Sequence, residues 1–189
     1  MKITAIVPAA SLNGLYKLSI DGNFVGKISA DDIIDLKLVI NREVNEELHL
    51  LITILVDFQK YYQKALTRAS NRLYSSYEIK QYLLSRGCNE DVASRIILRL
   101  LNLGIIDELR LCETFITNSM EYKPISQKSI LNKLKQKRIP NSIIQASFEK
   151  INYDNELALD KMIAKKTKQQ SYLNDKNKLF RYLVANSLS

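Results

Sequence analysis

The sequence predicts a mainly α-helical protein made of tandem three-helix repeats, preceded by an N-terminal β-hairpin extension. From about residue 43 onward, apolar residues recur in steps of three or four, which is the period of one face of an α-helix. The pattern of one helical segment returns 51 residues later, which is typical of a repeat protein. Before residue 30, apolar and polar residues alternate as they do in strands. We therefore expect two complete helix-turn-helix-like repeats and an incomplete third.

The N-terminal extension is predicted from a turn signal between two alternating segments. Residues 16–20 and 24–28 flank an Asp-Gly-Asn tripeptide at 21–23, and Asp-Gly readily adopts the positive φ angles of a tight hairpin turn. Residues 3–7 are a candidate third strand. Because the charge and the periodicity both change further along the chain, we expect residues 1–42 to form an appendage and a linker.

The first repeat is predicted from its helix start and stop signals. Residues 43–69 contain neither proline nor glycine, so they form one long amphipathic helix, or two joined by a kink, whose end begins the repeat. A serine at position 75 or 76 is suited to cap the next helix, and Gly87 to end it in the left-handed conformation. Asn89 is placed to cap a third helix, which Gly104 ends.

The later repeats are predicted from the offset of 51 residues. Ile79 corresponds to Ile130 and Leu83 to Leu134, so the middle helices of two repeats share a buried face. A third repeat begins near residue 155 and is incomplete within this sequence. The predicted domain boundaries are 1–42, 43–104, 105–153 and 154–189.

Several classes of function are excluded by composition. His49 is the only histidine, and the five glycines form no phosphate-binding loop, so multi-histidine metal sites and P-loop chemistry are absent. Cys88 and Cys112 have apolar neighbours, which predicts buried thiols. We expect no catalytic site, no cofactor and no metal. The longest apolar run is far shorter than the roughly 18 residues of a membrane span, and no signal-peptide pattern is present, so we expect a cytoplasmic protein.

The charge is positive and unevenly distributed. The chain has a formal net charge of +8, of which residues 1–56 contribute −2, residues 57–106 contribute +4 and residues 107–189 contribute +6. This distribution indicates that the helical part contacts a polyanion or an acidic protein surface, although a solvated polar face is the alternative. The candidate contact residues are Arg68, Arg72, Arg86, Lys128, Lys133, Lys135, Lys137 and Arg138.

An ordered set of motif residues consists of Ala65, Leu66, Arg72, Ser75, Glu78, Ile79, Leu83, Gly87, Leu100, Leu101, Gly104, Ile106, Asp107 and Glu108. This set resembles the bacterial RecX family, which modulates the RecA recombinase. The family has glycine at the end of the second repeat's middle helix, where this chain has Arg138. Asp107 and Glu108 of the matching Ile-Asp-Glu motif are suited to start a helix, with partner contact as the alternative.

The resemblance implies a regulator rather than an enzyme. It predicts a monomer that binds the RecA filament, contacts DNA indirectly or weakly, and acts stoichiometrically in recombination, DNA repair and the SOS response. Two other hypotheses stay open on the sequence. One is a DNA-binding module that uses a helix-turn-helix pair in the major groove, and the other is a helical scaffold unrelated to recombination.

Overall fold

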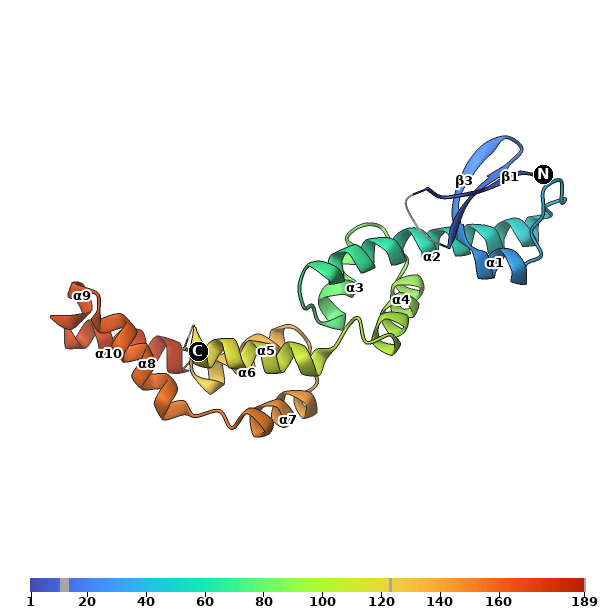
Figure 1. Cartoon of the computed structure of the whole chain (residues 1–189). Coiled ribbons are helices and arrows are strands. Elements are labelled where there is room, and N and C mark those ends of the chain that lie inside the picture. Colours follow the sequence, from blue (N-terminus) through green and yellow to red (C-terminus); the bar gives the residue numbers. More distant parts are fainter. Residues whose placement is uncertain (11–13, 123, 189) are drawn as a thin grey trace. The chain divides into compact units, whose positions relative to one another are not determined.

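The computed structural model describes residues 1–10, 14–122 and 124–188, which form a small sheet followed by helices (Figure 1). In these ranges, no helix combines the length and the apolar character needed to cross a membrane. The strands are β1 (Ile3–Pro8), β2 (Leu15–Ile20) and β3 (Asn23–Ser29). The helices are α1 (Ala30–Asp35), α2 (Glu46–Asn71), α3 (Ser76–Leu84), α4 (Glu90–Asn102), α5 (Glu108–Glu121), α6 (Gln127–Gln136), α7 (Asn141–Ile151), α8 (Asn155–Thr167), α9 (Gln170–Leu173) and α10 (Lys176–Leu188).

The chain divides into two compact units. Unit 1 consists of Met1–Asn71 and Lys80–Asn102, and it holds the sheet, α1, α2 and α4. Unit 2 consists of Arg72–Ile79 and of the chain from Leu103 onward, and it holds α5 to α10. Helix α3 is shared, because its first turn belongs to unit 2 and the remainder to unit 1. The domain boundaries predicted from the sequence remain predictions.

The predicted hairpin and the candidate third strand are confirmed as one antiparallel sheet in the order β1-β2-β3. Asp21 and Gly22 have φ angles of 48° and 80°, which are the left-handed values that a two-residue hairpin turn requires. The outer edge of β1 is covered at its first residue, where Ile3 N donates to Arg42 O at 3.0 Å and Asn41 N donates to Ile3 O at 2.8 Å. In the described part of the chain, β3 has no strand partner on its outer side.

The sheet packs against the first half of α2 (Figure 1). Ser29 caps α1, since its Oγ accepts a hydrogen bond from Asp32 N at 3.1 Å. In this shared core, Leu18, Ile28 and Ile52 are fully buried. Burying such a side chain contributes on the order of 1.5–3 kcal/mol, so the extension is held to α2 mainly by apolar contact.

The offset of 51 residues is confirmed by equivalent buried positions and equivalent helix caps. Ile79 and Ile130 are both fully buried. Ser75 Oγ accepts from Glu78 N at 3.2 Å, and Ser126 Oγ accepts from Ser129 N at the same distance. Both middle helices therefore begin with a serine cap at the same place in the repeat.

The two middle helices also end in the same way. In the first repeat, Gly87 has φ +81° and Cys88 N donates to Leu83 O at 3.1 Å. In the second, Arg138 has φ 57° and Ile139 N donates to the carbonyl of Leu134 at 3.4 Å. A left-handed residue followed by this long-range bond is the Schellman motif, in which glycine is favoured because it lacks a Cβ. Arg138 occupies that position without this advantage.

Arg138→Gly is expected to raise the free energy of unfolding by about 0.5–1 kcal/mol, because glycine adopts a positive φ without steric cost. Arg138→Ala is the matched control, because it removes the same charge and keeps the unfavourable φ. Chemical denaturation of the three proteins measures the difference. A glycine variant no more stable than the alanine variant would contradict this explanation.

The third repeat is less well buried than the other two. Leu179 and Leu183 on α10 correspond to Ile130 and Leu134 in the sequence, but they are only half-buried. In α8 the buried side chains are Ala158 and Met162. The short helix α9 lies between α8 and α10 and was not predicted. The sequence pattern therefore indicated a helical third repeat, but neither α9 nor how tightly the helices pack.

Candidate functional site

Lys137 is one of the candidate contact residues. In unit 2 it joins the end of α6 to α3 through an ion pair and a hydrogen bond. Lys137 Nζ lies 2.5 Å from Glu78 Oε1, and the two side chains are only 26% and 23% exposed. Ser75 Oγ donates to the carbonyl of Lys137 at 2.8 Å. Ser75 N donates to Glu78 Oε2 at 3.0 Å, which completes a capping box at the start of α3. Lys137 therefore has a structural role that its position in the sequence did not indicate.

The pKa of the Glu78 carboxyl is lowered by these contacts. Burial alone would raise the pKa, but the hydrogen bonds from Lys137 and from Ser75 N, together with the charges of Lys137 and Arg72, hold it below the ordinary value of 4.5. The carboxylate is consequently ionised at neutral pH, and the ion pair is present under physiological conditions.

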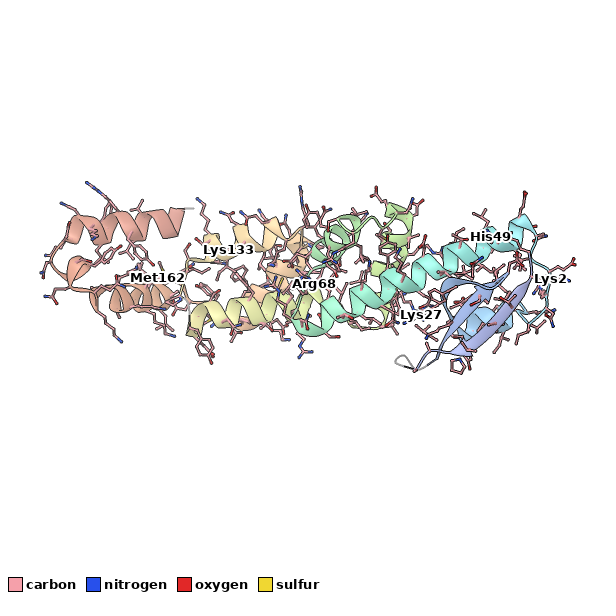
Figure 2. The ribbon with its side chains drawn as sticks, turned by 90° about the horizontal axis from the view of Figure 1, so that it is seen from above. Lys2, Lys27, His49, Arg68, Lys133 and Met162 are labelled. Carbon is pink, nitrogen blue, oxygen red and sulfur yellow. The ribbon has the colours of Figure 1, made fainter. Side chains whose placement is uncertain are left out.

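Three other candidate lysines lie on α6 with their side chains exposed. Lys128 and Lys135 are seven residues apart and therefore share a face, opposite the buried Ile130 and Leu134. Lys133 lies on the same helix toward its flank (Figure 2). We call these three exposed side chains the α6 lysine surface (Lys128, Lys133 and Lys135).

Lys133 also borders a groove of about 500 Å³ at the end of α5. Phe115 and Ile125 are half-buried in its lining, and Tyr122 at its rim is 69% exposed. The α6 lysine surface is thus adjacent to an exposed aromatic ring. This combination suits a partner surface that offers both negative charge and apolar contact.

In unit 1 the candidate arginines contact an aromatic ring. The guanidinium groups of Arg68 and Arg86 each lie 5.0 Å from the centroid of the Tyr82 ring. Arg68 belongs to α2 (Figure 2), and Arg86 follows α3, so the pair links these two helices. Tyr61 OH donates to the carbonyl of Arg86 at 3.3 Å. Cation–π contacts of this kind contribute about 0.5–1 kcal/mol at exposed sites.

The two remaining candidates, Arg72 and Arg138, lie in unit 2 and contact different tyrosine rings. Arg72 lies 4.4 Å from the Tyr74 ring and is exposed. Arg138 lies 5.9 Å from the ring of Tyr77. The eight candidate residues therefore do not form one site, because they are distributed over the two units and only the lysines of α6 share an element.

The Ile-Asp-Glu motif has a structural role at the start of α5. Asp107 Oδ1 accepts a hydrogen bond from Arg110 N at 2.8 Å, which is a helix cap. Glu108 Oε1 accepts from Ser76 N at 3.0 Å and so satisfies a backbone donor at the start of α3. The predicted capping is confirmed, and Glu108 adds a second contact between α3 and α5.

Two solved structures are similar to this chain over most of its length. A crystal structure of regulatory protein RecX is similar with a TM-score of 0.78 and 20% identity, covering 100% of this chain and 94% of that one. RecX from Lactobacillus salivarius is similar with a TM-score of 0.58 and 27% identity, covering 70% and 89%. The first of these shows a shared fold.

A family profile matches the first repeat, and similar sequences match along most of the chain. A family profile described as RecX, first three-helix domain, matches residues 62–100. Regulatory protein RecX of Lactobacillus johnsonii is 26% identical over 153 residues, and that of Leuconostoc citreum is 23% identical over 173 residues. The alignments cover 80% and 89% of this chain but only 56% and 64% of those relatives. Regulatory protein RecX of Finegoldia magna is 25% identical, covering 86% of this chain and 82% of that protein.

Proposed function

We propose that the chain is a RecX-family regulatory protein that binds the RecA–DNA filament and inhibits recombinase assembly and activity. The partner follows from the family resemblance of the motif residues. In this proposal the protein acts in the cytoplasm as a monomer, without a cofactor and without catalysis of its own. Its roles are in recombination, DNA repair and the SOS response.

The observation that carries the proposal is the exposed α6 lysine surface. Residues 128–138 contain five cationic side chains and no acidic one, in the part of the chain with the largest positive charge. Because the side chain of Lys137 is only 26% exposed, the proposal assigns filament contact to the exposed Lys128, Lys133 and Lys135. The positive charges of these side chains are complementary to the phosphates of DNA or to an acidic groove of the filament.

The mode of inhibition in this proposal is a shift of an equilibrium. A ligand that binds one state of an assembly better than the other states changes their populations by its difference in affinity. If the repeats bind RecA protomers only in one filament arrangement, they slow growth and ATP turnover in proportion to the amount bound. Inhibition is therefore expected to be stoichiometric and to saturate with the number of filament sites.

Replacing the three lysines with glutamate is expected to weaken inhibition of DNA-dependent RecA ATPase by at least about tenfold, while the thermal melt stays unchanged. Each lost phosphate contact weakens binding and flattens its dependence on salt, whereas exposed lysines change stability by about 0.5 kcal/mol or less. The measurement is ATP turnover on single-stranded DNA at two salt concentrations, with each protein titrated in.

The matched control carries glutamate at Lys17, Lys168 and Lys176, which are exposed and lie outside α6. This control has the same net charge and is expected to inhibit like the wild type at both salt concentrations. The assignment of contact to α6 is wrong if the two triple variants inhibit equally. Absence of any effect of the wild-type protein on RecA would refute the proposed partner itself.

Direct DNA binding by a helix-turn-helix pair is the second candidate. Arg95 and Arg99 on α4 are exposed, which favours it. However, the first turn of α4 carries Glu90 and Asp91, and both are also exposed. The N-terminal residues of a recognition helix enter the major groove and contact the bases. In this mode Glu90 and Asp91 would lie close to the negatively charged DNA, which is unfavourable. Affinity for naked duplex DNA with a steep salt dependence, in the absence of RecA, would support this candidate over the regulator.

A further inference from the structure

A groove of about 390 Å³ lies between β3 and α2 in unit 1. On the helix side it is lined by Val56, Gln59, Lys60 and Gln63, which are spaced along one face of α2. On the strand side it is lined by four consecutive residues, 24–27. Successive side chains of a strand point to opposite faces, so a groove that touches four in a row runs along the edge of the strand.

The edge of β3 is open to pairing. The start of the outer edge of β1 is covered by residues 41–44, whereas β3 has β2 on one side and no strand partner on the other among the described residues. An uncovered edge strand presents unpaired backbone N–H and C=O groups, to which an extended peptide can add as a further strand. The groove therefore offers a strand edge as one wall and a helix as the other.

The helix wall presents a polar amide to the groove. Gln59 is only 5% exposed, and no hydrogen bond joins its side chain to another described residue. Its amide atoms are not among the described polar atoms that are both inaccessible to solvent and unpaired, so the amide keeps an accessible part. Because Gln59 lines the groove, a molecule in the groove can form a hydrogen bond with it.

The remaining lining combines apolar side chains with a small positive charge. Leu15 and Val56 are buried, and Phe24 at the groove is 62% exposed. The ionisable side chains that line the groove are Lys27 (labelled in Figure 2), Lys60 and Asp57. Lys60 Nζ lies 3.8 Å from Asp57 Oδ1, and the three together leave one net positive charge. The lining favours an occupant with apolar groups and a carboxylate.

We propose that this groove binds an extended peptide of a partner protein, with alternating acidic and apolar residues, which adds to β3 as a fourth strand. Its backbone pairs with residues 24–27, its apolar side chains contact Leu15 and Val56, and its carboxylates lie near Lys27 and Lys60. A polar group of the peptide bonds the amide of Gln59. This binding is independent of the proposed contact between α6 and RecA, and it is tested without RecA.

The first test uses a capped hexapeptide of alternating glutamate and valine, titrated into the full-length 15N-labelled chain. Binding is expected to shift the backbone amide signals of residues 24–27 and the side-chain amide signals of Gln59. A hexapeptide of alternating lysine and valine is expected to bind at least about threefold more weakly, because the groove carries positive charge.

Strand pairing itself is tested by N-methylation of the glutamate–valine peptide. Only one edge of an added strand bonds to β3, so methyl groups on the alternate amides of that edge are expected to weaken binding at least about tenfold. Methyl groups on the amides of the other edge are expected to leave affinity unchanged. Equal affinity of the two methylated peptides would overturn the fourth-strand arrangement.

Two variants of groove residues test whether the peptide binds in the groove. Lys60→Glu is expected to weaken peptide binding about three- to tenfold, whereas Lys64→Glu, one turn further along α2 and outside the groove, is not. Gln59→Leu is expected to weaken binding to a similar extent without lowering the melting temperature, because it removes an unpaired polar group.

Three outcomes would overturn the proposal. One is the absence of binding by the glutamate–valine peptide at millimolar concentration. Another is a destabilised Gln59→Leu variant, which would show that the amide is already paired within the protein. The third is a set of shifts at residues 24–27 that depend on protein concentration without peptide, which would show that a second copy of this chain occupies the groove.

Discussion

Gly26→Ala is expected to lower the free energy of unfolding by about 2–3 kcal/mol, because a Cβ at this position would overlap Cγ1 of Val56 on α2. Gly26 does not have a positive φ, so the requirement for glycine comes from space alone. Val56 is branched at Cβ and 9% exposed, and it has little freedom to rotate away. The overlap must therefore be relieved by a shift of β3 away from the helix.

The rescue experiment is Val56→Ala in the Gly26→Ala background. Removing the two methyl groups of Val56 creates the space that the new Cβ needs, so the double variant is expected to be at least about 1 kcal/mol more stable than the sum of the single changes predicts. Gly14→Ala is the matched control, because Gly14 has a positive φ and no atom of the described residues lies within 4 Å of the added Cβ, and its cost is about 1 kcal/mol or less. Strict additivity in urea denaturation would show that β3 and α2 are not in this close contact.

Lys137→Glu is expected to lower the free energy of unfolding by about 2–3 kcal/mol, because it places a second carboxylate beside Glu78 in a partly buried position. Lys133→Glu, one turn earlier on the same helix, is the matched control. Its side chain is exposed, so its melt is expected to change little. Equal stability of the two variants would show that the bond between Lys137 and Glu78 contributes nothing measurable.

Because of the same ion pair, we expect the stability of the protein to depend on pH. The pKa of Glu78 is lowered in the folded protein, so the carboxylate contributes stability above the unfolded value near 4.5 and loses that contribution as the pH falls through the folded value. The wild type is therefore expected to be more stable than Glu78→Gln at pH 7, and the difference is expected to shrink below about pH 4.5. A difference that stays constant between pH 7 and pH 3 would be inconsistent with an ionised Glu78.

The features that the sequence predicted correctly are those determined by neighbouring residues. The Asp-Gly turn, the serine caps and the glycine that ends α3 each depend on a few adjacent positions. The repeat was visible because Ile79 and Ile130 lie at the same point of two similar patterns. Local backbone preference and helical periodicity therefore accounted for most of the helices and for the hairpin.

The features that could not be predicted depend on residues far apart in the sequence. Glu78 and Lys137 are 59 residues apart, and helical spacing alone grouped Lys137 with Lys133 as a surface residue. The edge groove required knowledge of which strand lies outermost and of how α2 crosses the sheet. An unpaired amide such as that of Gln59 has no signature in the sequence, because burial and the absence of a partner are both tertiary properties.

The two cysteines lie in different units, with Cys88 in unit 1 and Cys112 in unit 2, and both are buried. Burial raises the pKa of both thiols, to about 11 for Cys112, so at neutral pH they are protonated as well as inaccessible. An alkylating reagent therefore reacts with each thiol only when the helices around it open. Its rate, compared with that in the unfolded chain, measures the free energy of opening of that unit alone. The unmodified chain thus contains one kinetic reporter in each unit, and a partner bound to unit 2 that slows alkylation of Cys88 would reveal energetic coupling between the two.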